Sequence, residues 1–170
     1  FQVMYSLKLN KENFNKKITF EIRDEFFETY TFDRFENAKL QISLFLERKG
    51  VSSNYLLKFE LEGILIDTAC DICGDNLDFK IKNETEFIIK ESTKINNSDD
   101  EIIFIDPKQK VIELNQFFYE LIYISVPQRI THETSKSECN IEMLRLIEKY
   151  KKSKKIDTSS WDKLKELKID

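Results

Sequence analysis

Apolar and polar residues alternate through most of the first half of the chain. Ile18, Phe20 and Ile22 alternate with polar residues, and residues 40–46 repeat the pattern. Period-two alternation turns one side of an extended segment towards a core, so each stretch predicts a half-buried β-strand. Between them, the aromatic and acidic residues 24–30 predict a helical turn.

The longest alternation follows a predicted turn at Gly50. It runs over residues 55–66 and restarts over residues 77–89, after an interruption that contains a Cys-x-x-Cys motif. Two long alternating segments around a short polar break predict an antiparallel hairpin, here with the cysteines at its tip. Residues 102–105 predict one more short strand before Pro107.

The period changes to that of a helix after residue 112. Asn115 is placed as an N-cap and Pro127 as a stop for a helix that we expect to pack on the sheet, with apolar residues at helical spacing: Phe117, Phe118, Leu121, Ile122 and Ile124. A second helical stripe follows Asn140 at Ile141, Leu144, Ile147 and Tyr150. Residues 151–160 are polar and without periodicity, which indicates a linker, and residues 161–167 predict a last short helix capped by Ser159 or Ser160.

These elements define an α+β fold. We expect a β-rich body of antiparallel strands, as a sheet or a partly open barrel, with two packed helices and a short C-terminal helix. Residues 1–150 would form this single domain, and residues 151–170 a basic linker with the terminal helix. A chain of 170 residues with 41% hydrophobic content is sufficient to build a core.

Composition excludes several classes of function. Three glycines and two prolines cannot supply a glycine-rich phosphate loop or a dinucleotide fingerprint. Because the chain has a single histidine, catalysis by a histidine-containing triad is disfavoured. No apolar run is long enough to span a membrane, and the first ten residues lack the pattern of a secretory signal. With three cysteines, these features indicate a cytoplasmic protein with reduced thiols.

Cysteine and histidine provide the only cluster with ligand chemistry. Cys70 and Cys73 lie on one predicted turn, and His132 and Cys139 follow much later. Thiolates and imidazole hold structural zinc in closed tetrahedral sites, so these four residues are candidate ligands. The alternative is a pair of reduced thiols with an unrelated loop histidine. A thioredoxin-type dithiol is disfavoured because no helical pattern follows Cys73.

Charge is distributed unevenly. Residues 1–139 carry 18 basic and 25 acidic side chains, whereas residues 140–170 carry nine basic and six acidic ones. The tail could contact phosphates through four lysines, or it could be a solvated linker; the lysines are Lys151, Lys152, Lys154 and Lys155.

Trp161 begins a small apolar helical face that could dock on this domain or on a partner. Four aromatic residues lack interleaved basic residues, which favours a core role over base stacking: Phe26, Phe27, Tyr30 and Phe32.

The order of these features resembles the YceD family, the large ribosomal RNA subunit accumulation proteins, in its Bacteroidetes-like form. The resemblance covers nearly the whole chain and depends most on three segments: the Cys70–Cys73 knuckle, Val-Pro-Gln-Arg-Ile-Thr-His at residues 126–132, and Trp-Asp-Lys-Leu-Lys-Glu-Leu at residues 161–167. The chain departs from the family pattern at Ile72, Gly74 and Glu133, but it keeps all four candidate ligands.

The resemblance implies a cytoplasmic, non-catalytic ribosome biogenesis factor needed for accumulation of large-subunit ribosomal RNA. It also pairs the Cys-x-x-Cys with the later His and Cys, in one site for structural zinc. The expected partner is the ribosomal RNA precursor or a ribosomal protein, with no membrane and no small-molecule substrate. The acidic body would suit a basic protein, and the basic tail, or the loop that carries Arg129 and His132, would be left for RNA. The alternatives are a metal-dependent hydrolase or nuclease and a Cys70–Cys73 redox switch.

Overall fold

The computed structural model contains seven strands and three helices in its described part, which comprises residues 4–22, 24–35, 37–49, 54–92, 102–108 and 110–153, without the side chains of residues 24, 152 and 153. The elements are β1 (Ser6–Lys8), β2 (Lys17–Ile22), α1 (Asp24–Thr29), β3 (Asn37–Lys49), β4 (Asn54–Ala69), β5 (Asn76–Glu91), β6 (Ile102–Ile105), β7 (Val111–Glu113), α2 (Asn115–Ser125) and α3 (Ile141–Ser153).

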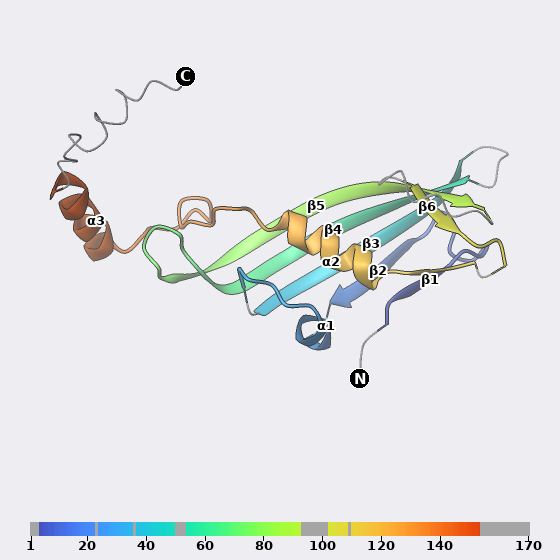
Figure 1. Ribbon diagram of the computed structural model, residues 1–170, viewed down its shortest axis with the longest axis horizontal. Coiled ribbons are helices and arrows are strands. Elements are labelled where there is room, and N and C mark those ends of the chain that lie inside the picture. The colour runs from blue at the N-terminus through green and yellow to red at the C-terminus, as the bar shows by residue number, and fades with distance from the viewer. Residues whose placement is uncertain are drawn as a thin grey trace, which may run out of the picture.

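An elongated five-stranded sheet forms the body, in the order β2-β3-β4-β5-β6 (Figure 1). All its neighbours are antiparallel except β5 and β6, which are parallel. The β4–β5 hairpin pairs Asn54 with Lys90 at one end and Ala69 with Asn76 at the other, which confirms the predicted long hairpin. The α+β class is confirmed as an open sheet rather than a closed barrel. The pair formed by β1 and β7 was not predicted.

Helix α2 covers one face of the sheet (Figure 1). Its Phe118 is fully buried, and its ring lies 5.6 Å from that of Phe20 on β2 and 6.2 Å from that of Phe59 on β4. The strands present their alternating apolar positions to this face, as the period-two pattern predicts. The aromatic residues of segment 26–32 pack in or against the same core, which agrees with the core interpretation.

Gly63 lies in the middle of β4, at a position where a side chain would clash with the neighbouring strand β3. A Cβ atom there would clash with the backbone oxygen of Lys39 and would lie 2.8 Å from the Cα atom of Leu40. β3 and β4 therefore approach each other closely at this point because residue 63 is glycine.

Three helix predictions need correction. Asn115 is not the N-cap of α2: that position is Leu114, and the Asn115 side chain instead accepts a hydrogen bond from the Tyr5 backbone N–H at 2.7 Å. Of the two helices predicted to pack on the body, α2 lies on the sheet, whereas α3 extends away beyond the end of the β4–β5 hairpin (Figure 1). Helix α3 also continues to Ser153, three residues into the predicted linker. The predicted terminal helix at residues 161–167 lies outside the described residues.

Candidate metal centre

The tip of the β4–β5 hairpin is a tight turn that presents two cysteines. The Cys70 N–H donates to the Asp75 carbonyl oxygen at 2.9 Å, and the Gly74 N–H donates to the Cys70 carbonyl oxygen at 2.9 Å. Gly74 adopts a φ of 81°, a left-handed conformation that glycine takes without strain. The turn buries Cys70 and Cys73, which are each 3% exposed.

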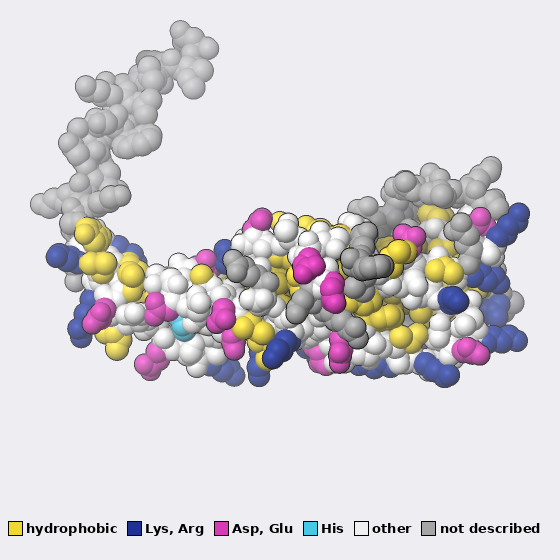
Figure 2. Space-filling model, turned by 90° about the horizontal axis from the view of Figure 1, so that it is seen from below, with side chains coloured by type: hydrophobic (Ala, Val, Ile, Leu, Met, Phe, Trp, Pro, Cys, Tyr) yellow, Lys and Arg dark blue, Asp and Glu magenta, His cyan; other side chains and the backbone are white. Residues whose placement is uncertain are grey.

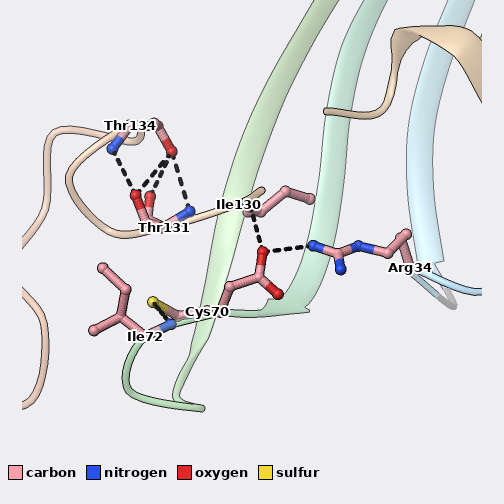
Figure 3. Close-up of polar contacts among 7 residues, drawn as sticks. Arg34, Cys70, Ile72, Ile130, Thr131 and Thr134 are labelled. Carbon is pink, nitrogen blue, oxygen red and sulfur yellow. Dashed lines mark hydrogen bonds and ion pairs between the residues drawn. The ribbon is translucent and has the colours of Figure 1, made fainter. Parts of the chain in front are cut away.

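A second, self-bonded loop follows α2 and carries the histidine. The hydroxyl of Thr134 donates to the Thr131 carbonyl oxygen at 2.7 Å, and the Thr134 N–H donates back to the Thr131 hydroxyl (Figure 3). The carbonyl oxygen of His132 accepts bonds from the Ser137 N–H at 2.8 Å and the Ser135 hydroxyl at 3.0 Å. These local bonds turn the loop back on itself and bury His132 at 8% exposure.

The two segments bring all three cysteines and the histidine together. One ligand atom from each of Cys70, Cys73, His132 and Cys139 lies within 4.8 Å of the other three. The sulfur of Cys73 is 3.3 Å from Nδ1 of His132, and the sulfurs of Cys70 and Cys139 are 3.9 Å apart. The four residues selected from the sequence therefore form one group that could hold a metal ion.

The environment changes the acidity of two of the thiols in opposite directions. Burial raises the pKa of Cys70, but the N–H groups of Cys73, Ile72 and His132 and the His132 side chain outweigh it and lower this pKa to about 6. Burial and the neighbouring thiols of Cys70 and Cys73 raise the pKa of Cys139 to about 11. Backbone donors directed at a sulfur stabilise the thiolate, which is the form that binds a metal.

Asp71 connects the two halves of the group, although it was not among the residues selected from the sequence. One carboxylate oxygen accepts bonds from Arg34 Nη2 at 2.6 Å and from the Ile130 N–H at 2.7 Å (Figure 3). The Asp71 N–H also donates to the Ile130 carbonyl oxygen at 2.8 Å. The bond from Arg34, and then that from Ile130, lowers the pKa of Asp71. A carboxylate between two ligand cysteines was the only available sequence signal.

Asn140 links the group to helix α3. Its side-chain oxygen accepts bonds from the N–H groups of Glu142 at 3.0 Å and Met143 at 3.3 Å, which is the geometry of an N-cap. Its side-chain nitrogen donates to a carboxylate oxygen of Asp75 in the hairpin turn at 3.1 Å. The start of α3 is thus fixed to the hairpin tip immediately after Cys139.

Only some of the residues predicted to contact RNA or a partner lie in the described part of the chain. Arg129 is exposed in the loop before His132, and Lys151 is exposed in the last turn of α3. The backbone of Lys152 belongs to the same helix. Lys154, Lys155 and Trp161 lie outside the described residues.

Helix α3 exposes an apolar face that the sheet does not cover. The exposed fractions are 37% for Met143, 46% for Leu146 and 65% for Tyr150. Figure 2 shows hydrophobic and basic side chains together on the end of the molecule that carries this helix. In the described part of the chain, none of the helices has the length and apolar character needed to cross a bilayer.

Comparison of the chain with family models, curated proteins and solved structures finds no match in any of the three. The resemblance to the YceD family therefore stays a prediction from the residues.

Proposed function

We propose that the Cys70–Cys73–His132–Cys139 group holds a structural zinc ion, and that the protein is a non-catalytic binding factor in biogenesis of the large ribosomal subunit. In this role it would be needed for accumulation of large-subunit ribosomal RNA in the cytoplasm. The observation that carries the proposal is the convergence of these four residues, in the order of the family pattern, beside an uncovered helix.

Two of the distances between ligand atoms match those of a tetrahedral zinc site. In a tetrahedron with Zn–S bonds of about 2.3 Å, two sulfurs lie about 3.8 Å apart, and a sulfur and an imidazole nitrogen about 3.5 Å apart. The Cys70–Cys139 and Cys73–His132 ligand atoms are separated by 3.9 Å and 3.3 Å. Three thiolates and one imidazole complete the shell, and such a closed set is typical of structural rather than catalytic zinc.

The exposed face of α3 favours a protein partner over RNA. Met143, Leu146 and Tyr150 recur at helical spacing, and contact with phosphates would leave these side chains in water. A short amphipathic helix gains most of its stability from tertiary packing, so α3 suits a partner's apolar groove. The basic residues Arg145, Lys149 and Lys151 would border that contact.

A gradient experiment tests the biological role. A tagged copy should sediment with precursors of the large subunit, and deletion of the gene should lower large-subunit ribosomal RNA. Leu146→Asp, which places a charge on the apolar face of α3, should release the protein from these fractions. Glu148→Gln on the opposite face of the helix is the matched control. Absence from every precursor fraction, with unchanged ribosomal RNA after deletion, would refute the role.

A thiol redox switch is the second candidate, favoured by the close approach of the three thiols within the group. The sequence predicted a Cys70–Cys73 switch, but the sulfur within hydrogen-bonding distance of Cys70 is that of Cys139, at 3.9 Å, so oxidation would join Cys70 and Cys139. Elemental analysis with a thiol count separates the candidates. One zinc ion and three thiols protected until a chelator is added support the structural centre, whereas a metal-free protein that forms a disulfide under mild oxidation supports the switch.

A further inference from the structure

Three segments far apart in the sequence meet at the carboxylate of Asp71. Asp71 comes from the hairpin tip, Arg34 from the connection between α1 and β3, and Ile130 from the loop after α2. A single oxygen of Asp71 accepts the bonds from Arg34 and Ile130, at 2.6 and 2.7 Å (Figure 3). A third bond, at 2.8 Å, joins the Asp71 and Ile130 backbones.

These bonds lie close to the candidate ligands in the sequence, so they affect the geometry of the metal group as well as the stability of the fold. Asp71 directly follows Cys70 and comes two residues before Cys73, and Ile130 comes two residues before His132. The Asp71–Ile130 contact therefore fixes the distance between the cysteine half of the metal group and the histidine half. None of the three bonds requires a metal ion.

We propose that Asp71 and Arg34 are positioning residues that assemble the metal centre before metal binds. This inference depends on the proposed zinc centre and extends it to residues that are not ligands. Ordering the two segments in advance lowers the entropic cost of bringing four ligands to one ion. Partners outside the ligand shell commonly change metal affinity by about 10- to 100-fold.

The solvent exposure of the bonded groups indicates which of the bonds contributes most to holding the two segments together. The side chains of Arg34 and Asp71 are 39% and 30% exposed, so solvent weakens their ion pair. Ile130 is fully buried, and its N–H would lose its acceptor if the carboxylate moved. Arg34 thus acts mainly by holding the Asp71 carboxylate where the Ile130 N–H needs it.

The experiment compares zinc affinity in variants of the full chain, measured by competition with a chromophoric chelator. Asp71→Asn and Arg34→Met should each bind zinc about 10- to 100-fold more weakly. The double variant should be little weaker than Asp71→Asn alone, because Arg34 acts through Asp71. Arg34→Lys, which restores the charge, should recover part of the loss.

Two further readouts separate positioning from a general loss of stability. Glu86→Gln removes the exposed Lys58–Glu86 ion pair of the sheet, at 2.8 Å, and is the matched control, with unchanged zinc affinity. The absorption spectrum of the Co²⁺-loaded variants should keep the thiolate bands of the unsubstituted protein, since no ligand has changed. In the metal-free protein, the Ile130 amide should exchange faster in Asp71→Asn than in Glu86→Gln.

The outcomes distinguish this inference from the proposed centre. Failure of the unsubstituted protein to bind Zn²⁺ or Co²⁺ would overturn both. Normal binding with unchanged affinity in Asp71→Asn and Arg34→Met would overturn the positioning role alone. If Asp71→Asn does not fold, the exposed Arg34→Met variant decides, and equal affinities for Arg34→Met and Glu86→Gln would refute the inference.

Discussion

Replacement of Cys139 by serine tests whether the four ligands act together. Cys139 is only half-buried, and its sulfur lies 3.9 Å from that of Cys70, so Cys139→Ser should change the stability of the metal-free protein by less than about 1 kcal/mol. The effect should appear when zinc is present, because only then does the sulfur complete a ligand shell.

The size of this effect follows from binding linkage. Free zinc at about 100 times the dissociation constant stabilises the unsubstituted protein by about 2.7 kcal/mol. Loss of a partner outside the ligand shell weakens metal binding by up to about 100-fold. If loss of a ligand weakens it at least as much, the same zinc stabilises Cys139→Ser by no more than about 0.4 kcal/mol. The difference of at least about 2.3 kcal/mol corresponds to about 5–9 °C in Tm for a chain of this size.

Thermal unfolding with buffered zinc and with a chelator measures this difference. Glu138→Gln, at an exposed neighbour of Cys139, is the control and should gain as much from zinc as the unsubstituted protein. An equal zinc-dependent rise in Tm for Cys139→Ser would show that Cys139 is not a ligand. The absence of a rise in every protein would refute the metal centre itself.

Three further predictions concern the core, the sheet and helix α3. Phe118→Ala should lower the free energy of unfolding by about 3–5 kcal/mol in urea titrations, because this ring is fully buried; Tyr123→Ala, 56% exposed on the same helix, should change it by less than about 1 kcal/mol, and similar losses would contradict the packing. Gly63→Ala should destabilise the sheet by more than about 1 kcal/mol, since its methyl group would push against the backbone of β3, and an unchanged urea midpoint would refute this close approach. Leu146→Asp should leave the Tm within about 2 °C because the side chain is 46% exposed, whereas a large drop would show that α3 packs on the body.

Local sequence patterns were sufficient for most of the sheet. Alternation at residues 40–46, 55–66 and 77–89 predicted β3, β4 and β5, because each strand has one buried face and the side-chain period of a strand is two. The same reasoning found α2 and its buried residues Phe118, Leu121 and Ile122, although Ile124 of the same predicted stripe is exposed. It missed β1 and β7, each three residues long and too short to show a period.

Helix α3 shows what an amphipathic sequence pattern cannot predict. Its stripe of apolar residues predicted a packed helix, but three members of that stripe, Ile141, Leu144 and Tyr150, are exposed in the structure. Periodicity states that a helix has an apolar face, and it does not state which surface covers that face. The role of Asn115 was wrong for a similar reason, since its side chain bonds to Tyr5, which lies 110 positions away.

The sequence by itself determined the donor atoms of the metal group, because only three cysteines and one histidine are present. It also determined that two of these cysteines lie at a hairpin tip. Only the tertiary structure decided that all four converge, and that Asp71, Arg34 and Ile130 hold the two halves together. The physical reason is the range of the interactions: alternation and turn chemistry act between near neighbours, whereas the contact between Asp71 and Ile130 joins residues 59 positions apart and exists only once the chain has folded.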